Sequence, residues 1–384
     1  MFRLRATEIH AGGEFVALVS PSEAVEREWE ELAARVGASP FRYPGWFRAW
    51  RGAFAGTELE ILAAWRGGRL VGAVPLVRAG RRKLDSPTNC ETPDFGFVAE
   101  DAAARQALAD ALFKESPRRV LIRLLDSEGL DYAELRRAAA RARYRTLERG
   151  SMHSPYVAIG DSWDAYERGL SRNVRGDARR RLRRLEEQGK LALHIESGGD
   201  LQRLLDEGYR LESSGWKAER GTAIGSRPEL RRFYTEIAEW AAERGWLRIC
   251  FLRLGGVAIA FHFNLVVDGV LYHLKGGYDP AFARFSPGKV LHYLMLEHAF
   301  KTELERYEFL GEDEPYKLRL ANSAHARLQF HAFAPRPVPL AERAAYVIGL
   351  PIGRRLIELT RNHAPVKRSR AHSSPAPTTV SPER

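Results

Sequence analysis

Residues 271–320, LYHLKGGYDPAFARFSPGKVLHYLMLEHAFKTELERYEFLGEDEPYKLRL, decide the fold of this chain. A β-rich run, 270–275, ends at a Gly-Gly pair and predicts a strand. Ser286 and Pro287 then predict the start of a helix, because serine is a good N-cap and proline suits the first helical position. Tyr307 to Leu310 predicts another strand, and residues 311–317 predict the loop that leaves it.

The start of the predicted helix is a candidate anion site. The N–H groups of a first helical turn and the positive end of the helix dipole can hold a phosphate. Arg284 and Lys289 flank this start and could neutralise the anion. From these residues alone we favour an ordinary capped helix over an anion site, and the P-loop pattern G-x-x-x-x-G-K-[ST] is absent.

Several short motifs together resemble the GNAT-superfamily acyltransferases of the CelD/BcsL-like type. These motifs are Tyr278-Asp279-Pro280, Ser286-Pro287-Gly288, the GEDEPYK loop at 311–317, Ser154-Pro155-Tyr156, Ser171-Arg172-Asn173 and Trp216-Lys217. The resemblance covers roughly residues 20–335. The usual GNAT loop is written Q/R-x-x-G-x-G/A. This chain has RFSPGK at 284–289 instead, one residue out of register and with a single glycine.

The resemblance implies an α/β fold with tandem GNAT-like domains, each a mixed, mostly antiparallel central sheet flanked by helices. Residues 65–76 (WRGGRLVGAVPL) and 253–264 (RLGGVAIAFHFN) support a repeat, since each predicts a strand, a Gly-Gly hairpin and an apolar strand. The first copy lacks a Ser-Pro-Gly helix start. We therefore predict a degenerate, substrate-shaping domain over 1–150 and an acyl-CoA-binding domain over 151–335. A basic helical extension should cover 336–365 and a disordered tail 366–384.

Composition narrows the class of protein. The chain has 384 residues, 45% of them hydrophobic and 28% charged, which suits two folded domains. We find no apolar run of the roughly 20 residues that a membrane span needs and no signal peptide, so a cytoplasmic protein is expected. The two cysteines are far apart in the sequence, and no metal site is predicted. The net charge of +11 suggests an anionic partner.

Two basic segments leave alternatives open. Between Ser171 and Gln188 the sequence predicts a helix with an apolar stripe. Arginines surround this stripe, at positions 172, 175, 179, 180, 181, 183 and 184. This pattern suits either a solvated basic face or a phosphate site, and without interleaved aromatic residues it does not favour stacking on RNA bases. The basic helix predicted from Leu340 to Asn362 could lie on an anionic membrane or pack against the second domain, and we favour packing. His262, in an apolar strand, is expected to be a core residue.

Acyl transfer to an amine needs a base, a polarised carbonyl and a proton for the leaving thiolate. No Ser-His-Asp or Cys-His pattern is visible, so direct transfer is expected. Asp279, Glu312 and Asp313 are base candidates, although the carboxylates at 312–314 could equally form salt bridges with Lys317 or Arg319. Tyr316 and Tyr278 are acid candidates. By resemblance, the predicted site comprises Asp279, Glu312, Tyr316 and Lys317 for catalysis, Arg284, Ser286, Pro287, Gly288 and Lys289 for the donor, and Trp216, Lys217 and Tyr278 for the acceptor.

Three functions compete at this point. The first is an N- or O-acyltransferase that uses acetyl-CoA or another acyl-CoA on a small acceptor, such as a sugar or amino-sugar precursor of envelope or extracellular polysaccharide. The second is a Fem-like ligase, a related group that uses aminoacyl-tRNA as donor; the arginine helix favours it, but no long helical-hairpin insertion is evident. The third is a non-catalytic basic binding module. The sequence does not specify the acceptor, the acyl chain or the oligomeric state.

Overall fold

The computed structural model describes residues 15–54, 58–80, 82–114, 116–214 and 224–348. The chain divides into two compact units, Met1–Pro335 and Arg336–Arg384. In the second unit, residues 337–348 are helical, and the rest of the predicted basic extension, 349–365, lies outside the described residues. The predicted tail at 366–384 lies outside the described residues.

The first half of the large unit alternates strands and helices. Its elements are β1 (Phe15–Val19), α1 (Glu23–Arg35), α2 (Pro44–Ala53), β2 (Leu59–Arg66), β3 (Arg69–Arg78), β4 (Lys83–Asp85), β5 (Val98–Ala99), α3 (Ala102–Lys114), β6 (Arg119–Asp126), α4 (Leu130–Arg141) and β7 (Arg145–Ala158). The sequence missed β4, which has three residues and lies in a polar, turn-rich segment.

The second half repeats this order after two extra helices. Its elements are α5 (Trp163–Gly169), α6 (Arg172–Glu186), β8 (Leu191–Glu196), α7 (Leu201–Glu212), α9 (Pro228–Glu243), β9 (Leu247–Leu254), β10 (Val257–Val267), β11 (Val270–Tyr278), the short 3-10 helix η3 (Pro280–Phe285), α10 (Pro287–Lys301), β12 (Arg306–Glu308), α11 (Pro315–Leu318) and β13 (Ser323–Phe333). The sequence predicts a helix from Pro228 to Arg244, and α9 matches it within one residue; the helix start predicted at Ser286 is also confirmed.

The two halves share one topology, which confirms the tandem fold. The order β1-β2-β3-β4-β6 in the first half corresponds to β8-β9-β10-β11-β12 in the second. Each run ends in a parallel pair, β4 with β6 and β11 with β12, whereas its other pairs are antiparallel. The two Gly-Gly hairpins also correspond, and each shifts register at an equivalent place: β3 skips Val71 and β10 skips Ile259. Bulges at matching positions mean that the two hairpins share one geometry.

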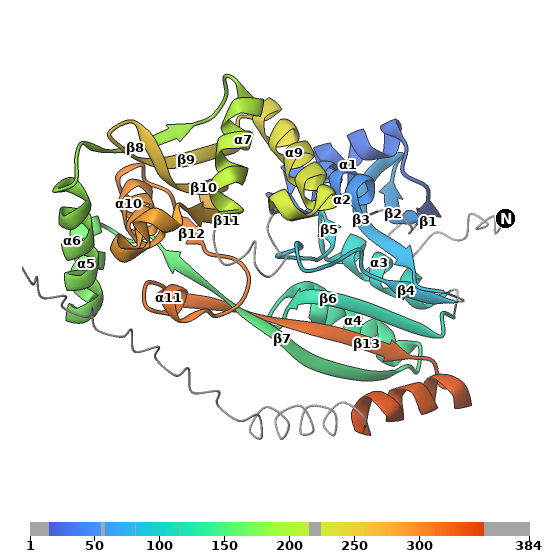
Figure 1. The fold of residues 1–384 in the computed structure, drawn as a ribbon. Coiled ribbons are helices and arrows are strands. Elements are labelled where there is room, and N and C mark those ends of the chain that lie inside the picture. Colours follow the sequence, from blue (N-terminus) through green and yellow to red (C-terminus); the bar gives the residue numbers. More distant parts are fainter. Residues whose placement is uncertain (1–14, 55–57, 81, 115, 215–223, 349–384) are drawn as a thin grey trace, which may run out of the picture. The chain divides into compact units, whose positions relative to one another are not determined.

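The last strands of the two repeats, β7 and β13, are exchanged. β7, which ends the first repeat, pairs with β12 of the second, and β13, which ends the second, pairs with β6 of the first. β7 and β13 also pair with each other along their length, and Figure 1 shows them side by side between the halves. The described strands thus form one 13-stranded sheet. The predicted boundary at residue 150 falls inside β7.

Helices cover both faces of the second-repeat sheet. Phe261 and Phe263 of β10 belong to the core that contains α7 and α9, whereas Ile259 and Ala260 pack with α10. α2 of the first repeat packs on α9 of the second through ring contacts such as Trp46 with Phe233, whose centroids are 5.1 Å apart. The aromatic residues Trp46, Phe47 and Trp50 are all buried, as their helical spacing predicts.

Candidate functional site: a basic cleft beside the start of α10

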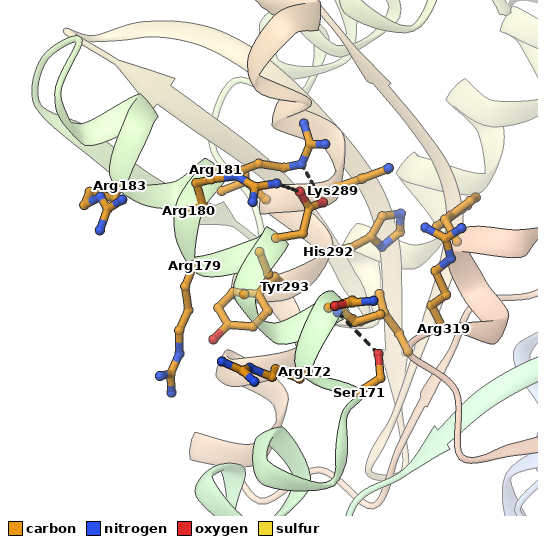
Figure 2. Close-up of a pocket in the computed structure, with 18 residues that line it drawn as sticks. Ser171, Arg172, Arg179, Arg180, Arg181, Arg183, Lys289, His292, Tyr293 and Arg319 are labelled. Carbon is orange, nitrogen blue, oxygen red and sulfur yellow. Dashed lines mark hydrogen bonds and ion pairs between the residues drawn. The ribbon is translucent and has the colours of Figure 1, made fainter.

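A cleft of about 990 Å³ lies between α6, α10 and the segment after α11. Figure 2 shows arginines of α6 along the cleft, Lys289, His292 and Tyr293 of α10 inside it, and Arg319 on the opposite wall. Its basic lining residues are Arg172, Arg179, Arg180, Arg181, Arg183, Lys289 and Arg319. The arginine helix and the predicted anion site, more than 100 residues apart in the sequence, therefore form one cleft.

The start of α10 differs from the expected capped helix. Ser286 takes the N-cap position, but its backbone is left-handed, with φ of 52°, and its side chain makes no capping hydrogen bond. The hydroxyl instead accepts a hydrogen bond of 2.6 Å from the Arg181 guanidinium. The Lys289 and Val290 N–H groups donate to the Ser286 carbonyl, and proline has no N–H. A phosphate here would therefore depend on the Gly288 N–H and on side-chain cations.

Most arginines of α6 already have acidic partners. Arg179 forms an ion pair with Glu167, and Arg180 and Arg181 bind Asp177 at 2.5 and 2.7 Å. The hydrogen bond from Arg181, opposed by partial burial, holds the pKa of Asp177 below its usual range. Arg183 is 3.7 Å from Glu187.

Arg172 and Arg319 differ from the paired arginines of the cleft. Among the residues that the structure describes, no carboxylate lies within ion-pair distance of Arg172 or Arg319. Both side chains are exposed and line the cleft. Unlike the paired arginines, these two can bind an incoming anion without first losing a partner.

Of the four predicted catalytic residues, only Tyr316 lines the cleft. Tyr316 lines the cleft, and burial raises the pKa of its phenol. Lys317 is buried, where its ammonium donates to the Leu310 carbonyl at 2.7 Å and the Glu312 carbonyl at 3.2 Å. Asp279 accepts from the Ala281 N–H at 2.9 Å and caps η3. Neither Asp279 nor Glu312 lines the cleft.

The residues predicted to bind the donor and the acceptor also lie in different places, and not all of them line the cleft. Lys289 lines the cleft, whereas the Arg284 guanidinium lies over the Phe285 ring at 4.6 Å. Ser286, Pro287 and Gly288 form the helix start just described. Tyr278 packs beside Gly288, where an added Cβ would lie 3.5 Å from its ring. Trp216 and Lys217 lie outside the described residues.

The last part of β11 has an open edge. It pairs with β12 only from Val270 to Tyr272, while β10 follows it on to Tyr278. Beyond Tyr272, the described part of the chain places no strand against the β12 side of β11. The backbone of this strand end can therefore accept an extended ligand chain between β11 and β12.

Three histidines that the sequence did not bring together meet behind the cleft. His262 of β10, His273 of β11 and His292 of α10 are all buried, with ring centroids 4.1 to 4.7 Å apart. Burial, with Lys317 adding to it, lowers the pKa of His292 to about 3, so this ring is neutral. His262 is buried as predicted, but it is not an isolated core histidine. The signal available in the sequence was the β10–β11 hairpin, which brings His262 and His273 onto adjacent strands.

The corresponding helix start in the first repeat is closed to anions. Asp101 precedes α3, accepts the Ala104 N–H at 2.9 Å and forms an ion pair with Arg66 at 2.8 Å. A carboxylate at this position repels phosphate from the helix dipole that would otherwise attract it. That the first repeat is a degenerate domain stays a prediction.

Comparisons with known proteins agree with this architecture. Residues 172–318 match the family model described as acetyltransferase (GNAT) domain. The chain resembles the crystal structure of FemX with a TM-score of 0.55 and 12% identity, over 86% of this chain and 99% of that one. It also resembles the C-terminal domain of a putative lysylphosphatidylglycerol synthetase from Agrobacterium fabrum, with a TM-score of 0.51 and 13% identity, over 85% and 97%.

A conserved protein of unknown function from Bacteroides thetaiotaomicron is similar as well, with a TM-score of 0.53 and 11% identity, over 83% of this chain and all of that one. No curated protein matches the sequence significantly. Among the described helices, none has the length and apolar character needed to cross a membrane. Residues 172–318 are thus similar to a GNAT-type acetyltransferase domain, and the solved structures share the fold of the longer chain.

Proposed function

We propose that this protein is an acyl-CoA-dependent acyltransferase whose donor phosphates bind in the basic cleft. The observation that carries the proposal is the convergence of Arg172, Lys289 and Arg319 beside the start of α10. CoA carries several phosphate charges close together, which suits this cluster of cations. The helix dipole of α10 adds a favourable field at the same place.

The acyl arm of the donor would lie along the open edge of β11. Backbone N–H groups of this strand would polarise the thioester carbonyl, and no side chain is needed for that step. Tyr316, which lines the cleft, is the candidate acid for the leaving thiolate. The acceptor would be a small amine or alcohol, and a sugar or amino-sugar precursor of envelope or extracellular polysaccharide is our first choice.

The test replaces Gly288 with Asp. An added Cβ at Gly288 meets only ordinary van der Waals contact, so the variant should fold. The new carboxylate should weaken acetyl-CoA binding by on the order of 1–3 kcal/mol, because it repels the phosphates at the helix start. The matched control is Gly288→Asn, which has the same shape without the charge. Equal affinities of the two folded variants, measured by calorimetry, would place the donor elsewhere.

An aminoacyl-tRNA-dependent ligase is the second candidate, because the fold also resembles FemX. A tRNA would need a continuous set of cations, but the pairs with Glu167 and Asp177 neutralise much of α6. We expect acetyl-CoA to raise the melting temperature of the protein and tRNA to leave it unchanged at physiological salt. Tight, salt-sensitive tRNA binding would reverse this choice.

A further inference from the structure

Three buried histidines converge on one point from three elements of the second repeat. His262 and His273 come from the adjacent strands β10 and β11, and His292 comes from α10, which covers that face of the sheet. One ring nitrogen of each lies within 4.8 Å of those of the other two. We propose that these histidines form a binding site for one divalent transition-metal ion, with zinc as the best-suited occupant.

Hydrogen bonds around the cluster determine which ring nitrogen carries the proton and which is available to bind a metal. Nδ1 of His273 is 2.9 Å from Oδ1 of Asn264, and the Asn264 amide is oriented by its own Nδ2–H group, which donates to Cys250. An amide oxygen can only accept, so Nδ1 of His273 carries the proton and Nε2 carries the lone pair. Metal-ligating histidines typically donate their other N–H in this way.

His292 has a similar partner. Its Nδ1 lies 3.2 Å from the Tyr307 hydroxyl, and both groups are buried. With Nδ1 engaged by the phenol oxygen, Nε2 is the nitrogen left for a ligand. Two of the three histidines thus have a buried polar partner on Nδ1, which is the second layer that a metal site requires.

The chemistry of the donor set selects the ion. Three imidazole ligands suit zinc, copper, nickel or iron and do not suit magnesium or calcium, which prefer oxygen ligands. Zinc bonds of about 2.0–2.1 Å place tetrahedral ligand atoms about 3.3 Å apart, so ring shifts of about 1 Å would complete the site. Three protein ligands also leave a fourth position, which water or a substrate takes in catalytic zinc sites.

The cleft supplies an entry path. His292 and Tyr316 both line it, and their rings are 5.3 Å apart. An ion at the three histidines would also tie the first turns of α10 to β10 and β11. It would therefore fix the helix that carries Lys289, independently of which donor binds in the cleft.

The experiment measures metal binding directly, on the full chain purified without a histidine tag. Zinc affinity is obtained by competition with a chromophoric chelator, and the cobalt form is examined by visible spectroscopy. We expect about one ion per chain and the intense visible bands of four-coordinate cobalt. Tyr307→Phe removes only the hydroxyl on His292 and should weaken zinc binding about 10- to 100-fold.

Ligand and control variants complete the test. His273→Gln should abolish the cobalt bands, whereas His331→Gln should not alter them. His331 is buried like the three cluster histidines, but it lies on β13, outside the cluster. If His273→Gln does not fold, the wild type and Tyr307→Phe still decide the question. A wild type that takes up neither zinc nor cobalt overturns the proposal, as does a cobalt spectrum that persists in folded His273→Gln.

Discussion

Arg172 and Arg319 have no carboxylate partner among the described residues, and this difference from the other cleft arginines does not show in the sequence. In the sequence, position 172 is one of seven similar arginines, and position 319 is outside the basic helix altogether. The fold gives most of the seven a carboxylate or carbonyl partner and brings Arg319 to the same cleft. An exposed cation with an existing partner contributes little to binding a new anion, because one pair is exchanged for another.

This difference predicts unequal effects on donor binding. Replacing both Arg172 and Arg319 with Gln should lower acetyl-CoA affinity at least about 10-fold, since two charge-assisted contacts are lost. Replacing Arg179, Arg180 and Arg183 with Gln removes more charge, yet it should change affinity less than about threefold. Calorimetry at one salt concentration compares the two variants. A larger loss in the triple variant would contradict this assignment.

Gly45 controls how two helices of different repeats pack. It lies in α2, and a Cβ added there would be 2.1 Å from the Trp240 indole nitrogen of α9. Trp240 is buried and contacts Trp246 ring to ring, so it cannot easily move. The missing side chain therefore permits the close approach of the two helices.

We predict that Gly45→Ala destabilises the protein by roughly 1–3 kcal/mol through overpacking. Gly52→Ala, in the same helix, is the matched control. Its Cβ would be 2.9 Å from a carboxylate oxygen of Glu236, the end of a flexible side chain that can turn away. The better helix propensity of alanine, about 0.5–1 kcal/mol, should make this change neutral or stabilising. Chemical denaturation of both variants checks the contrast.

Element by element, much of the fold follows from local sequence. The Gly-Gly pairs fixed both hairpins because their turns need positive φ, which is 57° and 80° at Gly67 and Gly68 and nearly the same at Gly255 and Gly256. The starts of α9 and α10, each with proline at the first helical position, could also be predicted from the sequence. The hydroxyl of Ser286 was misassigned, because its partner Arg181 is distant in the sequence. The histidine cluster was missed for the same reason.

The exchange of β7 and β13 could not be predicted from hydrophobic pattern. A strand has the same alternation whichever strand it pairs with, so the sequence of β13 does not show that it joins β6 of the other repeat. Asp94 helps to fix this arrangement. Its carboxylate binds Arg42 at 3.0 Å in the first repeat and Arg327 of β13 at 2.9 Å.

Asp94 should make stability depend on pH. Burial alone would raise its pKa, but Arg42 and Arg327 outweigh burial and hold the pKa well below its usual range. A lowered folded-state pKa means that the stabilisation is complete above the unfolded value of about 3.9 and is lost as pH falls below it. Asp94→Asn should cost on the order of 3 kcal/mol at pH 7, since it removes the buried charge that Arg42 and Arg327 share and leaves them only their longer contacts with Asp131 and Asp126.

The measurement is the free energy of unfolding between pH 2 and pH 7. The difference between wild type and Asp94→Asn should be constant near neutrality and shrink below about pH 4. Asp110→Asn is the control, because Asp110 pairs with the half-exposed Arg141 and should cost under about 1 kcal/mol. A difference that does not change with pH would show that Asp94 acts through packing alone.

The exchanged strands also set the timing of biosynthesis. β6 ends at Asp126, but its neighbour β13 ends at Phe333, about 200 residues later. At roughly 5–20 residues per second, a ribosome needs about 10–40 s to make that segment. During this interval the nascent first repeat has one sheet edge uncovered, and such an edge invites pairing with other chains. We therefore expect the first repeat to need chaperone protection on the ribosome and to become protease-resistant only once β13 has emerged.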